Sequence, residues 1–203
     1  MILFRNVLNK VNVKTQCIYK TKWGSRFETI SLEWNFIFKI CFDTILDNNI
    51  IWFQYRIIYR ILGTQSLRKK MGTSDTSLCR ICNNQEETLE HLFLTCPYVE
   101  NLWAKIKTSF ACSGTELGTT NPVDILLGTW QRNKNCKALN TLCLITKYYI
   151  FQCAKKCQKP SFKALQHYIQ IFYEEQQYLA KIKNQENNFD RQWTLASQII
   201  ILE

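Results

Sequence analysis

The sequence predicts a mainly α protein, a helical bundle with an inserted CCHC zinc knuckle, and three observations lead to this fold class. Glycine and proline number only 6 and 3 among 203 residues, so long stretches lack residues that break helices. Apolar residues make up 46% of the chain and recur at helical spacing in several segments. Three cysteines and one histidine lie close together between residues 79 and 96. This content suits one or two small domains with a hydrophobic core.

Two helices are predicted in the first part of the chain, one from Trp34 to about Leu46 and one over Ile50 to Leu62. Asp47 precedes the second helix and is expected to cap it, and Gly63 is expected to end it. Residues 1–33 are basic and of mixed composition, and no element is assigned to them.

The second half of the chain predicts three longer helices. One runs from Pro97 to about Phe110, with proline in the first turn, where its missing N–H costs nothing. The segment Ser113 to Pro122 is rich in Gly, Thr and Asn and is the best candidate for a linker. A helix from about Ala138 to Cys157 is apolar on most sides and is expected to be central, and Ser161 is expected to cap the next helix.

These patterns divide the chain into three predicted parts. Residues 1–72 form a basic helical segment, residues 73–112 a zinc-binding domain, and residues 123–203 a helical C-terminal tail. The formal net charge is +10, and it is concentrated in the two flanks around a mildly acidic centre. Such a distribution favours a polyanionic partner, with simple solubility as the alternative.

The chain shows neither a long uncharged apolar run nor the start of a secretory signal peptide. We therefore expect an intracellular protein without a membrane partner. The ten cysteines should then be reduced, and reduced cysteines two residues apart are more often metal ligands than partners in a disulfide.

The candidate metal ligands are Cys79, Cys82, His91 and Cys96. Zinc prefers four soft or borderline ligands in a tetrahedron, and three thiolates with one imidazole form a common structural set. Four protein ligands leave no open position for a substrate or water. The pattern therefore predicts one structural Zn²⁺, against the alternative of four unrelated buried residues.

The spacing of the last two ligands demands a break in the chain. His91 is expected on a short helix, and residues five apart on a regular α-helix point about 140° away from each other. Cys96 precedes Pro97, and a residue before proline is disfavoured in the α region. The helix should therefore end at Thr95 or Cys96, which allows the thiol to turn toward the imidazole. A structural zinc contributes about 10–16 kcal/mol of apparent binding free energy, enough to hold a small polar loop together.

This region resembles the zinc-binding domain that follows the polymerase in non-LTR (LINE-type) retrotransposon reverse transcriptases. The resemblance is specific at residues 79–103, where it rests on Cys79-Arg-Ile-Cys82, on Glu86 through Pro97, and on Leu102-Trp103. A weaker likeness extends over roughly residues 34–193. It implies a C-terminal segment of a reverse transcriptase that positions template RNA or target DNA during target-primed reverse transcription. The implied partners are RNA or DNA and the polymerase domain of the parent protein, in a nuclear or cytoplasmic ribonucleoprotein.

The polymerase itself is not recognisable in this sequence. Polymerases and nucleases need clustered carboxylates for their metal ions, and the only close aspartates, Asp43 and Asp47, are expected on a solvated helix face. We therefore expect no enzymatic activity and no small-molecule substrate for this chain. A zinc-folded scaffold that docks on the polymerase domain, with little contact to nucleic acid, is the alternative function.

A basic cluster is the candidate nucleic-acid surface. Arg56 and Arg60 are expected to share one helix face, and three further cations follow shortly after. Such residues neutralise phosphates with little sequence preference. The full candidate set is Arg56, Arg60, Arg68, Lys69 and Lys70.

Other residues receive the plainer interpretation. Trp52, Phe53 and Tyr55 could stack on bases, but their spacing favours the hydrophobic core. Cys153 and Cys157 are expected on one helix face without further ligands nearby, and His167 is assigned no chemistry.

Overall fold

The computed structural model describes Trp23 and residues 34–44, 47–112, 121–129 and 136–201. Within these ranges the chain forms helices and no β-strand, apart from one antiparallel bridge between Leu78 and Glu86. The predicted fold class, mainly α with an inserted Cys/His cluster, is confirmed.

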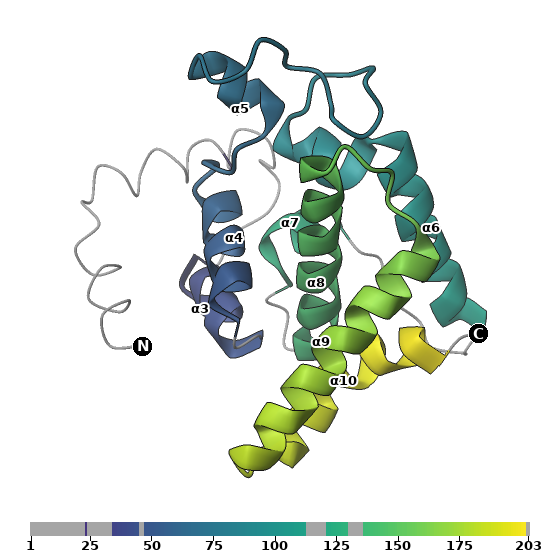
Figure 1. Ribbon diagram of the computed structural model, residues 1–203. Helices are drawn as coiled ribbons and strands as arrows, with labels where there is room; N and C mark the ends of the chain where they lie inside the picture. The colour runs from purple at the N-terminus through teal and green to yellow at the C-terminus, as the bar shows by residue number, and fades with distance from the viewer. Residues whose placement is uncertain (1–22, 24–33, 45–46, 113–120, 130–135, 202–203) are drawn as a thin grey trace.

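Figure 1 shows the arrangement of the helices around α8, which runs through the middle of the molecule. The described elements are α3 (Trp34–Thr44), α4 (Asn48–Ile58), α5 (Gln65–Lys70), η1 (His91–Thr95), α6 (Pro97–Cys112), α7 (Pro122–Leu127), α8 (Cys136–Lys155), α9 (Phe162–Ile182) and α10 (Glu186–Ile201). Helix α8 packs against α3, α4, α7, α9, α10 and η1. It can do so because apolar residues cover most of its circumference, and Leu142, Ile145 and Ile150 are fully buried.

Helix α4 begins as predicted but ends earlier. The Asp47 carboxylate accepts a hydrogen bond from the Asn49 amide at 2.7 Å, which caps the helix. The helix ends at Ile58, and Arg60 takes a left-handed conformation with φ of 57°. The prediction that Gly63 ends the helix was wrong. The amides of the two residues after Arg60 return to the carbonyl of Arg56, so the C-terminal carbonyl is satisfied before the glycine is reached.

The structure does not describe most of the predicted linker, and the linker ends earlier than expected. Residues 113–120 of the Ser113 to Pro122 segment lie outside the described residues. Its last two residues instead start a helix, because the Asn121 side chain accepts from the Val123 amide at 3.2 Å and Pro122 occupies the first turn of α7. Neither this short helix nor α5 nor α10 was predicted from the sequence.

Gly128 follows α7 and has a structural role that another residue could not fill. Its φ is 91°, outside the range that L side chains readily adopt. A Cβ here would lie 3.0 Å from the Ile40 side chain and 3.1 Å from the Asn140 amide oxygen. The Asn140 side-chain amide also accepts a hydrogen bond from the Thr129 amide and donates one to the Thr129 carbonyl. Helices α3, α7 and α8 therefore meet closely at this point.

Buried hydrogen bonds connect α4, α7 and α8 within the hydrophobic core. Lys147 on α8 is 2% exposed, and its ammonium donates to the Gln54 amide oxygen at 2.7 Å and to the Leu126 carbonyl at 2.8 Å. Gln54 on α4 also donates to Leu126 at 2.8 Å. Helices from the predicted parts 1–72 and 123–203 thus share one core, while the boundaries proposed for the three parts stay a prediction.

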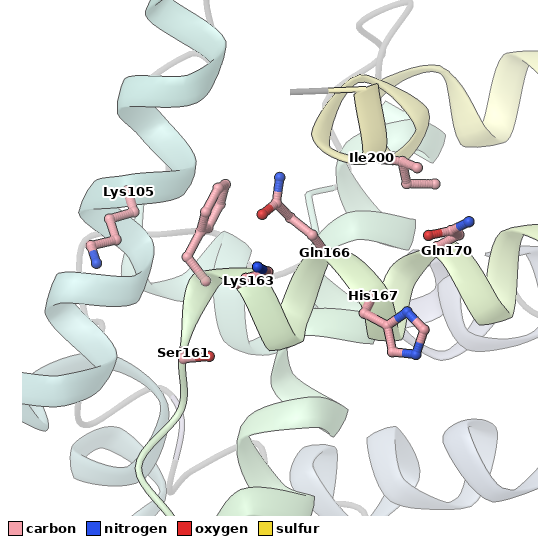
Figure 2. Close-up of a pocket in the computed structure, with 8 residues that line it drawn as sticks. Lys105, Ser161, Lys163, Gln166, His167, Gln170 and Ile200 are labelled. Atoms are coloured by element: carbon pink, nitrogen blue, oxygen red, sulfur yellow. The ribbon is translucent and has the colours of Figure 1, made fainter. Parts of the chain in front are cut away.

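The tail ends in an antiparallel pair of helices, α9 and α10. Ser161 caps α9 as predicted, accepting from the Ala164 amide at 3.2 Å. The rings of Tyr173, Phe189 and Trp193 pack against one another between the two helices. Figure 2 shows the start of α9 with α6 on one side and α10 on the other. Among the described helices, none has the length and apolar character that crossing a bilayer requires.

Candidate metal centre

The structure brings the four predicted ligands together. One ligand atom from each of Cys79, Cys82, His91 and Cys96 lies within 4.8 Å of the others, and three of the four residues are buried. A tetrahedral zinc ion with bonds of about 2.0–2.3 Å has ligand atoms about 3.5–3.8 Å apart. The Cys82 sulfur and the His91 Nε2 atom, 3.3 Å apart, already approach this separation. The group fits a zinc ion after small side-chain adjustments.

Cys79 and Cys82 lie on a tight knuckle turn. The Ile81 amide donates to the Cys79 sulfur at 3.4 Å, and the Asn83 amide donates to the Cys79 carbonyl at 2.8 Å. Asn83 closes the turn in a left-handed conformation with φ of 55°, which asparagine tolerates better than most residues. An amide directed at a cysteine sulfur favours its thiolate form, so the backbone itself prepares this ligand for a cation.

His91 and Cys96 meet through one wide helical turn, as the spacing argument requires. The Cys96 amide donates to the His91 carbonyl at 2.9 Å, so η1 is a single π-type turn. Cys96 itself is extended, with φ of −69° and ψ of 125°. The expected break before Pro97 is therefore present, and it turns the Cys96 side chain away from the helical path toward the other ligands.

Aromatic side chains pack against the wide turn and support it. The Trp103 indole on α6 donates to the Phe93 carbonyl at 2.9 Å, which satisfies a backbone acceptor in the irregular turn. The Phe93 ring packs edge-on against Phe53 of α4, and Phe53 contacts Phe151 of α8. The metal centre therefore sits directly on the shared hydrophobic core.

The orientation of the His91 ring identifies its ligand atom. Nε2 faces Cys82, while Nδ1 lies 3.4 Å from the Thr95 hydroxyl. When Nε2 binds a metal, Nδ1 carries the proton and donates it to Thr95, which holds the ring in place. Burial lowers the pKa of His91, so the neutral ring that a metal requires is available at neutral pH.

The thiols of Cys79 and Cys96 lie close enough to interact with each other. Their hydrogen bond raises the pKa of Cys79, as does burial, whereas it lowers the pKa of Cys96. Two sulfurs that share a proton in this way are close enough to share a cation instead. Zinc bound by three thiolates and one imidazole would have no open position, and the ion would stabilise the fold rather than act on a substrate.

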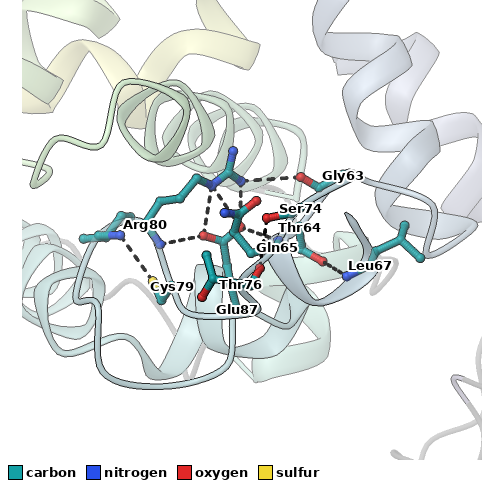
Figure 3. Close-up of polar contacts among 10 residues, drawn as sticks. Gly63, Thr64, Gln65, Leu67, Ser74, Thr76, Cys79, Arg80 and Glu87 are labelled. Atoms are coloured by element: carbon teal, nitrogen blue, oxygen red, sulfur yellow. Dashed lines mark hydrogen bonds and ion pairs between the residues drawn. The ribbon is translucent and has the colours of Figure 1, made fainter. Parts of the chain in front are cut away.

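A buried carboxylate links the knuckle turn to α5 (Figure 3). The Glu87 side chain is fully buried and forms an ion pair with Arg80 at 2.6 Å, and it also accepts from the Arg80 amide at 2.9 Å. Its Oε1 atom accepts from the Gln65 amide at 3.0 Å, at the start of α5. Arg80 follows Cys79 directly, so the first residues of α5 are held by the same loop that carries the metal ligands.

Comparison with known proteins gives one match. Residues 14–103 match the family model described as zinc-binding in reverse transcriptase. This zinc-binding match includes all four residues of the Cys/His cluster and ends at Trp103. No curated protein matches the chain, and no solved structure does. The match thus covers the Cys/His cluster, while the residues after 103 lie outside it.

The candidate basic residues do not all remain available to a ligand. Arg56, Arg68, Lys69 and Lys70 are exposed, and the last three form the end of α5. Arg60 differs, because its guanidinium pairs with Glu90 at 2.7 Å and lies 4.6 Å from the centroid of the Trp23 ring. The prediction that Arg56 and Arg60 share a helix face was wrong, since α4 ends before Arg60. Arg60 instead links the end of α4 to the metal-binding region through its ion pair with Glu90.

The remaining sequence interpretations have mixed outcomes. Phe53 is buried in the core, as favoured, but Trp52 is 41% exposed. Cys157 lies beyond the end of α8, so it does not share a helix face with Cys153, contrary to expectation. Asp43 and Asp47 do not share a helix face either, because Asp47 caps α4 while Asp43 belongs to α3.

Three supporting residues around the centre were not singled out from the sequence. Arg80 and Glu87 form the buried pair, and Thr95 contacts the histidine. The only signal in the sequence was their position among the ligands, because a charged residue in a polar loop is usually solvated.

Proposed function

We propose that this chain is the zinc-dependent, nucleic-acid-binding C-terminal part of a reverse transcriptase of the LINE type. One zinc ion is held by Cys79, Cys82, His91 and Cys96, and the ordered loop presents a basic helix to RNA or DNA. The zinc-binding match supports the connection to reverse transcriptases. In this role the chain positions template RNA or target DNA beside the polymerase domain, within a nuclear or cytoplasmic ribonucleoprotein, and performs no chemistry of its own.

The observation that carries the proposal is the attachment of α5 to the metal-binding loop. Glu87 accepts from the Gln65 amide, and the Glu87 carbonyl accepts from the Ser66 amide at 3.3 Å. Glu86 accepts from the Ser66 hydroxyl at 2.5 Å. These contacts fix the start of α5, so the three consecutive exposed cations at its end have a defined position relative to the metal. A helix of six residues would not be stable alone.

Exposed cations in a fixed array suit a phosphate backbone. Arg68, Lys69 and Lys70 form no ion pair with any described carboxylate, so they need not break an ion pair when phosphate binds. Binding of this kind releases counterions and depends strongly on salt, with little sequence preference.

The proposal is tested by nucleic-acid binding of the zinc-loaded chain at several salt concentrations. The variant Arg68→Gln, Lys69→Gln, Lys70→Gln should flatten the dependence of log K on log salt by about 2 for a single-stranded probe, because each lost contact removes about 0.7. The control is Lys181→Gln with Lys183→Gln, which removes two exposed charges at the far end of α9. An unchanged slope in the triple variant would refute a role for α5.

A second candidate function is a scaffold that docks on the polymerase domain. Ile61, Met71 and Leu78 are 54%, 67% and 45% exposed in the segment around α5 and the knuckle turn, which is a high exposure for large apolar side chains. The triple substitution Ile61→Ser, Met71→Ser, Leu78→Ser separates the two functions. It should weaken binding to a separately produced polymerase domain if the scaffold is correct, and leave the salt slope for RNA unchanged.

A further inference from the structure

A basic groove lies between α6, α9 and α10, outside the region of the zinc-binding match (Figure 2). It encloses about 850 Å³ and opens to solvent. Lys105 of α6 and Lys163 of α9 lie on its walls, and His167, Gln166 and Phe162 complete much of the lining. No part of the function proposed above uses this groove.

The electrostatics of the groove favour an anion. Among the described residues, its lining contains two lysines and no carboxylate. Neither Lys105 nor Lys163 forms an ion pair with an acidic group in the described part of the chain. Two cations in the lining of one concave surface give it a positive potential, which favours an anionic ligand.

The groove also offers apolar and hydrogen-bonding surface. Phe162 is only partly buried, and Ile200 lies on the α10 side. A ligand with charge alone would gain little from these residues. A chain that combines phosphates with flat bases would use both, because bases stack on aromatic rings while lysines follow the backbone.

The basic surface continues from the groove toward the metal centre. Lys159, in the α8–α9 connection, holds its ammonium 4.4 Å from the centroid of the Tyr98 ring. Tyr98 comes two residues after Cys96 and is 37% exposed. Lys159 and Lys163 come before and after Ser161, the cap of α9, so Lys159 adds a cation between the first turn of α6 and the start of α9.

We propose that this groove binds a segment of single-stranded nucleic acid, with Lys105, Lys159 and Lys163 contacting phosphates and Phe162 stacking on a base. The inference deepens the proposed function, on which it rests, by placing a second binding surface in the tail. It separates the roles of the two surfaces, since α5 depends on the metal loop whereas the groove is built by long helices of the shared core.

The test measures binding of fluorescein-labelled oligouridylate to the full zinc-loaded chain over a range of salt concentrations. Lys105→Gln with Lys163→Gln should reduce the magnitude of the salt slope by about 1.4, at about 0.7 per lost contact. Phe162→Leu should weaken binding about tenfold and leave the slope unchanged, because it removes stacking without removing charge. Lys181→Gln with Lys183→Gln, at the far end of α9, is the charge-matched control.

The outcomes separate this inference from the function on which it rests. If the α5 triple variant loses binding while the groove variants behave as wild type, the groove inference is overturned and the proposed function stands. If neither set of variants changes the slope, both are overturned. Equal binding of polyglutamate, with the same slope and the same response to Phe162→Leu, would also overturn the assignment to nucleic acid.

Discussion

The Cys96 amide hydrogen-bonds the His91 carbonyl at 2.9 Å across a turn that is one residue wider than an α-helical turn. This contact makes a chelating pair out of two residues that a regular helix would direct apart. The turn requires a residue that leaves the helix at Cys96, which Pro97 enforces, and a donor for the Phe93 carbonyl, which Trp103 supplies.

The hydroxyl of Thr95 should hold the metal-binding tautomer of His91. Thr95→Val keeps the shape of the side chain but removes the oxygen that lies 3.4 Å from Nδ1. We expect zinc affinity to fall about 10- to 100-fold, as is typical for loss of such a supporting contact. Competition with a chromogenic chelator measures the affinity. Thr95→Ser keeps the oxygen and should bind nearly as tightly as the wild type, and equal affinity in all three proteins would contradict this role.

Removal of zinc should disorder the knuckle turn and α5 while leaving the long helices in place. Structural zinc contributes about 10–16 kcal/mol of apparent binding free energy, more than the loop gains from its own contacts. Hydrogen exchange before and after chelation should show faster exchange at the amides of Cys79, Asn83 and Gln65, with little change in the centre of α8.

Cys82→Ser should purify with less than one equivalent of zinc. Cys157→Ser, which changes an exposed cysteine outside the cluster, is the control and should retain the metal. Full zinc content in Cys82→Ser would exclude the proposed ligand set.

The buried pair of Arg80 and Glu87 should be a major source of stability near the centre. Glu87→Gln removes the charge that Arg80 faces at 2.6 Å, where the two side chains are 10% and 0% exposed. Breaking a buried pair by changing one partner costs about 3–5 kcal/mol. Urea unfolding of the zinc-loaded chain measures the loss. Asp75→Asn, in an exposed part of the same region, should change the free energy of unfolding by less than about 0.5 kcal/mol.

Arg60 should affect stability and leave phosphate binding unchanged. Arg60→Gln removes an ion pair with Glu90 and a contact with the Trp23 ring, at a cost of about 2 kcal/mol. Thermal unfolding should reveal this loss, whereas the salt slope for oligouridylate should stay the same. A lower slope at undiminished stability would restore Arg60 to the nucleic-acid surface.

Lys147 should be more important for the core than an exposed lysine of the same helix. Lys147→Met leaves the Gln54 amide oxygen without this donor, and an unsatisfied buried acceptor costs about 1–3 kcal/mol, whereas the Leu126 carbonyl keeps its hydrogen bond from Gln54. Lys155→Met is the control on α8. The loss should shrink when Gln54→Leu is already present, because the two residues share the interaction.

The ligand cluster could be predicted because its information is local. Cys79 and Cys82 are close in sequence, and Pro97 determines the conformation of the residue before it. The caps at Asp47 and Ser161 were predictable for the same reason, since a capping side chain reaches only the next turn. The basic triplet at residues 68–70 is also visible in the sequence, although the helix that carries it is not.

The sequence pattern could not predict which residues meet in the folded chain. Glu87 looks like an ordinary surface acid until Arg80 and the start of α5 enclose it, and Arg60 looks like a helix-face cation until Glu90 approaches it. Lys147 and Gln54 are far apart in the chain, and no periodicity indicates that their polar ends meet in the core.

By itself, the sequence determined the helical character of the chain, the identity of the Cys/His cluster and the break at Cys96, because these depend on side-chain chemistry and backbone preference within a few residues. The tertiary structure alone decided which cations remain exposed, where α5 is anchored and that α6, α9 and α10 enclose a basic groove. The physical reason is that burial and pairing are properties of surfaces brought together by folding, and a charged side chain has the same formal charge in the sequence whether it meets a carboxylate or water.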